Sequence, residues 1–100
     1  MSTQNISPTD ILLRFSIIIP TFNEAADIGK TLDSLLTLDY SEYEILVVDE
    51  STDQTYEIVQ SYSSEQVRYM RQTRGSGRAA ARNQGILAAS GEIVLLLNAD

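Results

Sequence analysis

The chain has 100 residues, of which 43% are apolar and 21% are charged, and its formal net charge is −7. That length holds one domain, and that composition is typical of a globular protein rather than a disordered or fibrous one. The chain contains no cysteine and no histidine. Disulfides, thiolate metal sites and imidazole bases are therefore excluded, and any metal ion must be bound by oxygen atoms.

The amino-terminal segment, residues 1–13, begins with a polar stretch without period and is expected to form a mobile leader. It shows no signal-peptide pattern. The first apolar cluster, from Ile11 to Ile19, contains Arg14 and ends at Pro20, whereas a membrane span needs about 20 apolar residues. We therefore expect no membrane span in this chain and a cytoplasmic location, although the complete protein could associate with a membrane.

Four runs rich in β-branched and apolar residues predict strands at residues 15–20, 44–50, 67–72 and 92–98. Three of these runs lack polar alternation, which is typical of strands covered on both faces. Strands of this kind, separated by helices, predict a mostly parallel sheet of right-handed βαβ units with helices on both faces. The expected fold is therefore a Rossmann-like α/β fold, with the fourth strand next to the first and an apolar edge exposed there.

Three stretches with helical spacing lie between the strands, at residues 23–38, 52–64 and 77–90. Asn23 is the expected N-cap of the first helix, and Thr52 or Asp53 is the expected N-cap of the second. The third helix is alanine-rich and is expected to end at Gly91.

The charges are divided along the chain. Residues 68–82 carry five arginines and no acid, whereas residues 1–67 carry twelve acids and two basic residues. Arg78 and Arg82 lie one helical turn apart behind two glycines, and guanidinium groups at a helix N-terminus suit a phosphate group. A solvated basic face is the alternative, and a nucleic-acid patch is disfavoured because no aromatic residues are interleaved. The pattern favours a phosphorylated small molecule and no nucleic acid.

Polar residues follow three of the predicted strands. They are Thr21, Asn23 and Glu24 after the first, Asp49, Glu50, Ser51, Thr52 and Asp53 after the second, and Asn98 and Asp100 after the fourth. Ligands of open parallel sheets bind beyond the carboxyl ends of the strands, so these side chains predict a binding rim. Turn and cap positions are the alternative explanation. The glycine fingerprint of dinucleotide-binding proteins is missing, because Ala80 stands where its last glycine would be, and no P-loop sequence occurs.

Three stretches, FSIIIPTFNEAADIGKTLDSLL, YEILVVDESTDQT and RGSGRAAARNQGILAASGEIVLLLNAD, occur in this order. Together they resemble the successive signatures of family 2 glycosyltransferases of the GT-A fold. The resemblance covers residues 14–100 and implies that this region is the N-terminal, nucleotide-binding half of such a domain, ending at its metal motif.

The resemblance implies transfer of a sugar from a nucleoside-diphosphate sugar, linked to UDP or GDP, to a hydroxyl of a glycan or lipid acceptor, with inversion. Asp49 is then expected to contact the base, and Phe22 to offer it an aromatic face, with a core position as the alternative for Phe22. The donor-binding residues implied in this way or by the rim are Pro20, Thr21, Phe22, Asn23, Glu24, Asp49, Ser51, Arg78, Arg82 and Asn98.

Two departures from the family pattern matter. Glu50 stands where the second signature usually has another aspartate, and the following loop is one residue shorter and lacks a glycine. The metal motif, Asp-X-Asp in the family, reads Asn98-Ala99-Asp100 here. We expect Asp100 to bind Mg²⁺ or Mn²⁺, and Asn98 to assist through a hydrogen bond without a charge, which weakens the site.

The resemblance places the catalytic base beyond Asp100, so we expect these 100 residues to bind the donor and to be inactive in transfer by themselves. A catalytically silent nucleotide-binding module is the alternative. A Rossmann-type oxidoreductase is disfavoured by the missing glycine fingerprint.

Overall fold

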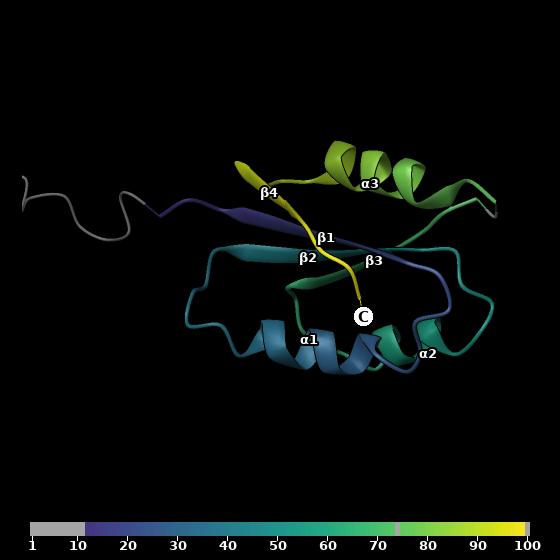
Figure 1. Cartoon of the computed structure of the whole chain (residues 1–100). Coiled ribbons are helices and arrows are strands. Elements are labelled where there is room, and N and C mark those ends of the chain that lie inside the picture. Colours follow the sequence, from purple (N-terminus) through teal and green to yellow (C-terminus); the bar gives the residue numbers. More distant parts are fainter. Residues whose placement is uncertain (1–11, 74, 100) are drawn as a thin grey trace, which may run out of the picture.

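The computed structural model describes residues 12–73 and 75–99, and shows an α/β sandwich in that part of the chain (Figure 1). The strands are β1 (Phe15–Thr21), β2 (Tyr43–Asp49), β3 (Val67–Arg71) and β4 (Ile93–Leu96), and the helices are α1 (Ile28–Leu36), α2 (Thr55–Gln60) and α3 (Gly77–Ala88). The strands form one sheet in the order β3-β2-β1-β4, and every pair is parallel. The predicted Rossmann-like fold is confirmed, and so is the position of the fourth strand beside the first.

The sheet has one core on each face. Helices α1 and α2 cover one face and α3 covers the other (Figure 1). The alternation of side chains along β1 and β2 explains the continuous apolar runs of the sequence, because odd-numbered residues face α1 and α2 while even-numbered residues face α3. The first core includes Ile17, Ile19, Ile28, Leu32, Ile45, Val47 and Val59, and the second consists of Ile18, Leu46, Val48 and Ala81.

Two glycines permit close packing against β1. A Cβ atom at Gly85 would lie 2.5 Å from Cγ2 of Ile18, so α3 sits on the strand at a distance that no side chain would allow. A Cβ atom at Gly91 would lie 2.7 Å from the carbonyl oxygen of Arg14. The prediction that Gly91 ends the third helix is wrong, because α3 ends at Ala88. Gly91 instead lets the chain pass the start of β1 before β4 begins.

The predicted helix caps also differ from the structure. Helix α1 begins at Ile28 behind Asp27, so Asn23 is not its N-cap. Asn23 has a φ of 55° and lies in the loop after β1. Helix α2 begins at Thr55 behind Gln54, so neither Thr52 nor Asp53 is its N-cap. Side chains in each loop accept hydrogen bonds from backbone N–H groups of the other loop before either helix begins.

A buried carboxylate joins the amino ends of the strands. Glu44 accepts hydrogen bonds from Ser16 Oγ at 2.6 Å, the Ser90 backbone N–H at 2.7 Å and Arg68 Nη1 at 2.8 Å. Burial by itself would raise the pKa of Glu44, but the hydrogen bonds from Ser16, Ser90 and Arg68 outweigh it and hold the pKa at about 2. This network fastens the starts of β1, β2 and β3 to the segment before β4.

The β4 side of the sheet exposes apolar side chains, as the sequence predicts. Val94, Leu95, Leu96 and Leu97 are between 36% and 49% exposed. Among the described residues, none of the helices has the length and hydropathy needed to cross a membrane. The expected leader, residues 1–13, lies outside the described residues except for Leu12 and Leu13.

Candidate functional site

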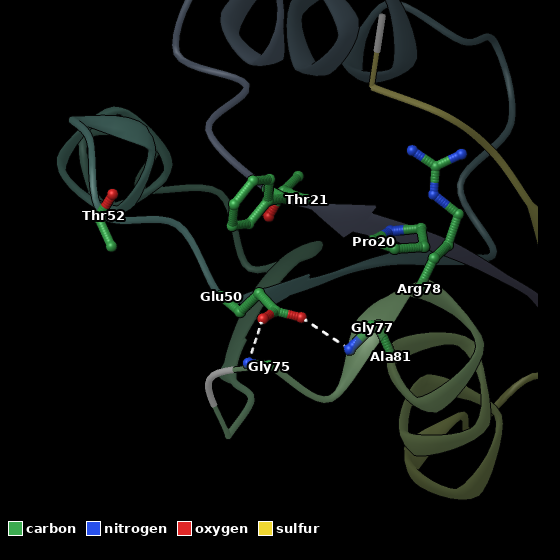
Figure 2. A pocket seen from close by; sticks show the side chains of 9 residues that line it. Pro20, Thr21, Glu50, Thr52, Gly75, Gly77, Arg78 and Ala81 are labelled. Atoms are coloured by element: carbon green, nitrogen blue, oxygen red, sulfur yellow. Dashed lines mark hydrogen bonds between the residues drawn. The ribbon is translucent and has the colours of Figure 1, made fainter.

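A cavity of about 510 Å³ lies at the carboxyl ends of β1 and β2, where the sequence predicts a binding rim. Its walls come from the end of β1, the first residues after β2 and the start of α3. They are formed by Pro20, Thr21, Phe22, Glu50, Thr52, Gly75, Gly77, Arg78 and Ala81. Figure 2 shows this cavity, with Thr52 on one side of the view and Pro20 and Arg78 on the other. We call it the rim cavity.

Phe22 is the exposed aromatic residue of the rim cavity. Its side chain is 60% exposed, so the alternative that it is a core aromatic is wrong. Pro20 and Thr21 are buried beside it at the end of β1. An aromatic ring held in the open beside a cavity is a surface on which a planar ring of a ligand can stack.

Asn23 and Glu24 follow Phe22 but do not line the rim cavity. Asn23 Oδ1 accepts hydrogen bonds from the backbone N–H groups of Thr52 at 2.8 Å and Asp53 at 3.2 Å. The Glu24 backbone N–H donates to Thr55 Oγ1 at 3.0 Å. These bonds tie the loop after β1 to the loop after β2, so both residues support the wall that carries Phe22 and Thr52.

Asp49 is fully buried beneath the rim. Its carboxylate accepts five hydrogen bonds: from Thr21 Oγ1, from the backbone and side chain of Ser51, from the Tyr69 hydroxyl and from Arg71 Nη1. Burial by itself would raise the pKa of Asp49, but the bonds from Ser51, Tyr69 and Thr21 outweigh it and lower the pKa. Burial and the bond to Asp49 raise the pKa of Tyr69 to about 12. The expected contact of Asp49 with a base stays a prediction, since its side chain has no exposed surface.

Glu50, the next residue, is the acid on the cavity wall. Its side chain accepts hydrogen bonds from the backbone N–H of Gly75 at 2.7 Å, the backbone N–H of Gly77 at 3.0 Å and Gln72 Nε2 at 3.0 Å. Figure 2 shows the carboxylate facing the two glycine nitrogens. Sequence reasoning placed Glu50 on the rim but did not select it as a site residue. The alternation along β2 is the signal that could have found it, because Asp49 and Glu50 face opposite sides of the sheet.

The two arginines expected at a phosphate site differ in position. Arg78, near the start of α3, is exposed, lines the rim cavity and makes no ion pair with a described residue. Arg82 is half-buried and does not line the cavity, and its Nε is buried without a hydrogen-bond partner among the described residues. The backbone N–H of Gly77, at the helix N-terminus, already donates to Glu50. Arg78 is therefore the cation that a ligand in the cavity can reach.

The expected metal site is at the end of the described chain. Asn98 is exposed after β4 and is not part of the rim cavity wall, and Asp100 lies outside the described residues. Between residues 12 and 99, leaving out 74, no three Asp, Glu, His or Cys side chains gather as a metal site. The described residues therefore do not form a metal site by themselves, and the assignment of Asp100 as a ligand stays a prediction.

A smaller cavity of about 380 Å³ lies on the α2 side of the rim. Its lining includes Thr52, Tyr56, Tyr69 and Arg71. Tyr56 and Tyr69 pack edge to face with their ring centroids 4.9 Å apart. Arg71 donates to the buried Asp49 at 3.2 Å. Thr52 borders both cavities, so the loop after β2 separates them.

Comparison with known proteins places this site in a family. The chain is 37% identical to the poly(ribitol-phosphate) beta-N-acetylglucosaminyltransferase TarS of Staphylococcus aureus over 94 residues, which are 89% of this chain and 16% of TarS. A crystal structure of S. aureus TarS 1-349 in complex with UDP-GlcNAc matches 88% of this chain and 27% of that one, with a TM-score of 0.83 and 36% identity. The mannosyltransferase PcManGT from Pyrobaculum calidifontis, in complex with GDP-Man and Mn²⁺, matches 88% of this chain and 28% of that one, with a TM-score of 0.81 and 35% identity.

The chain thus spans less than a third of the length of each of these proteins. The model of the family described as Glycosyl transferase family 2 matches residues 16–100. The two solved structures share the parallel sheet and its helices with this chain, which confirms the GT-A type of fold. The chain belongs to glycosyl transferase family 2.

Proposed function

We propose that this chain binds a nucleoside-diphosphate sugar in the rim cavity and serves the transfer of the sugar, with inversion, to a hydroxyl group of a glycan or lipid. The observation that carries the proposal is the pairing of an exposed aromatic ring, Phe22, with an exposed guanidinium, Arg78, on the walls of one cavity. A nucleotide offers a planar base to the first and an anionic diphosphate to the second. The relatives solved with UDP-GlcNAc and GDP-Man support this assignment.

We assign recognition of the base to the acidic residues at the end of β2. Uracil and guanine both present a ring N–H, which a carboxylate accepts well, so a UDP- or GDP-linked donor fits an acidic wall. Asp49 is the acid that the sequence predicts for this role. In the described geometry, contact with a base would require Asp49 to exchange one of its internal donors for the base N–H. Glu50 already borders the cavity, so it is the nearer acid.

We assign the divalent ion to Asp100, with Asn98 as its neutral neighbour. Mg²⁺ or Mn²⁺ bound there would neutralise the diphosphate as it becomes the leaving group. The Mn²⁺ in the PcManGT complex supports this proposal. Within the described residues, Arg78 is the group that offers positive charge to the diphosphate. No described residue is assigned as the catalytic base, and a cytoplasmic location remains part of the proposal.

A nucleotide-binding module without transferase activity is the second candidate. It needs only the exposed Phe22 and Arg78 on the walls of the rim cavity. The two candidates agree on nucleotide binding and differ only in turnover. Release of UDP or GDP from the corresponding sugar donor, measured with and without added acceptor, distinguishes them.

Calorimetric titration with UDP, GDP and ADP, with and without Mn²⁺, tests the binding proposal. We expect UDP or GDP to bind more tightly than ADP, and Arg78→Ala to weaken binding by about 2 kcal/mol, because a charge-assisted hydrogen bond is lost. Lys30→Ala is the matched control, since Lys30 is exposed on α1 and does not line the rim cavity. Equal binding of all three nucleotides, unaffected by Arg78→Ala, would reject the proposal.

A further inference from the structure

Two consecutive acids, the last residue of β2 and the residue that follows it, bond on opposite faces of the sheet. Asp49 has its partners on the α1 and α2 side, where Tyr69 and Thr21 donate to it. Glu50 has its partners on the α3 side, where Gly75 and Gly77 donate to it. Because neighbouring side chains of an extended chain point in opposite directions, the two acids cannot replace one another. Glu50 therefore has a structural role different from that of Asp49.

The partners of Glu50 form an anion-binding arrangement of backbone N–H groups. Gly75 and Gly77 have φ values of 84° and 88°, and both of their N–H groups point at the same carboxylate. Concave backbone segments with N–H groups of this kind bind anions, and a helix N-terminus adds to the attraction. Here the anion is a side chain of the protein itself. A ligand phosphate can use these two N–H groups only by displacing Glu50.

The Glu50 side chain is largely shielded from water, although it borders the rim cavity. The residue is 8% exposed. Gln72 donates from Nε2 both to Glu50 and to the carbonyl oxygen of Gly77, at 3.0 Å each. The Gln72 backbone N–H donates to the carbonyl oxygen of Asp49 at 2.8 Å, which anchors the other end of the segment to β2. Charge-assisted hydrogen bonds are stronger in such a place than in water.

We propose that Glu50 is a positioning residue: its carboxylate holds residues 75–77 and the start of α3 in place, and so presents Arg78 to the rim cavity. Arg78 directly follows Gly77, so the backbone that Glu50 fixes is the backbone that carries this guanidinium. An aspartate at position 50 would be one methylene shorter, so we expect it to hold the two glycines less well than Glu50 does. The proposal about the segment stands on the geometry alone, and its effect on nucleotide binding rests on the proposed function.

The first test measures the segment itself. Hydrogen exchange of the backbone amides at Gly75 and Gly77, followed by NMR spectroscopy of the full chain, is compared between wild type and Glu50→Gln. The amide has one acceptor oxygen and no charge, so we expect exchange at both glycines to accelerate about tenfold or more. Glu44→Gln is the matched control, because Glu44 is a buried acid on the same strand at its other end. It should leave the relative protection of these two amides unchanged.

The second test asks whether Glu50 acts through Arg78. We expect Glu50→Gln and Arg78→Ala to weaken binding of UDP or GDP by a similar factor, and the double variant to bind no more weakly than Arg78→Ala alone. In Glu50→Ala, added propionate should restore both slow exchange at the glycines and nucleotide affinity. Glu50→Asp should restore neither in full.

Unchanged exchange at Gly75 and Gly77 in Glu50→Gln would overturn the proposal, and so would additive effects of Glu50→Gln and Arg78→Ala on nucleotide binding. A wild-type protein that binds no nucleotide would refute the proposed function instead. The exchange measurement would still decide whether Glu50 holds the segment.

Discussion

The two ends of the sheet each contain buried carboxylates, but the predicted binding rim and its cavity lie at the carboxyl end. At the amino end, Glu44 binds donors from β1, β3 and the segment before β4, and every contact stays within the framework. At the carboxyl end, Asp49 and Glu50 are also buried and accept several hydrogen bonds each, yet Phe22 and Arg78 stand exposed around a cavity next to them. A buried, fully bonded acid therefore marks a fastening point. The exposed aromatic and cationic groups beside it mark the place for a ligand.

The largest expected effect is a loss of stability when the hydrogen bonds at the amino end of the sheet are disrupted. Glu44→Gln removes the charge that pairs with Arg68 and leaves a buried amide among donors. We expect the free energy of unfolding to fall by about 3 kcal/mol, because several hydrogen bonds to one buried charge are weakened at once. Urea denaturation measures the loss, and nucleotide affinity of the folded fraction should be unchanged. A parallel loss of affinity would contradict the separation of the two ends.

Lowering the pH should destabilise the fold by a comparable amount, because protonation also removes the charge of Glu44. The pKa of Glu44 is lowered from 4.5 to about 2 in the folded protein. A lowered pKa stabilises the fold above the unfolded value, and this stability is lost as the pH falls through the range from 4.5 to about 2. The loss should reach about 3 kcal/mol at the bottom of that range. Denaturation curves between pH 6 and pH 2 should be less pH-dependent for Glu44→Gln, with a remainder from Asp49, whose pKa is also lowered.

A substitution at the carboxyl end of the sheet should have the opposite effect: it should weaken nucleotide binding and leave the free energy of unfolding nearly unchanged. Phe22→Ala removes an exposed ring, so we expect nucleotide binding to weaken by about 1.5 kcal/mol, the scale of stacking on a base. The free energy of unfolding should change by less than about 0.5 kcal/mol. Leu87→Ala is the control, because Leu87 is an exposed apolar residue on α3 away from the cavity wall. Calorimetry and urea denaturation of both variants check the pair.

The smallest expected effect concerns the metal ion. Asn98→Asp adds a carboxylate two residues before Asp100, so the concentration of Mn²⁺ or Mg²⁺ needed for half-maximal donor binding should fall severalfold, about 1 kcal/mol or less. Asp100→Ala should abolish the dependence on metal. Donor binding that is indifferent to EDTA and to both substitutions would show that this end of β4 takes no part in the site.

The strands and helices and their order along the chain could be predicted from the sequence, because runs of apolar residues indicate burial directly. β1 and β2 are apolar on both faces, as predicted, and the structure places them at the centre of the sheet. Helix starts were less predictable, since the role of Asn23 depends on N–H groups about 30 residues away that no local pattern reveals. The same holds for Gly91, which is required by a backbone contact with Arg14 rather than by a helix end.

The rim was predictable as a group, and so were four residues of its cavity wall, but the positions of Asp49 and Glu50 were not. Parallel strands bring their carboxyl ends together, which is why Pro20, Thr21, Phe22 and Arg78 share one cavity. The burial of Asp49 depends on Tyr69 and Arg71 from β3, and the position of Glu50 depends on two glycines 25 and 27 residues later. Such contacts are set by tertiary structure, so residue type and order alone did not reveal them.

The double hydrogen bond to Asn23 Oδ1 has a mechanical consequence. It joins the loop after β1 to the loop after β2 at Thr52 and Asp53, so the wall that carries Phe22 and Thr52 moves as one body. The opposite wall is fastened separately, because Glu50 accepts hydrogen bonds from the backbone N–H groups of Gly75 and Gly77 at the start of α3. The two walls of the rim cavity are thus held by independent sets of hydrogen bonds, so a substitution in one set should leave the other wall in place.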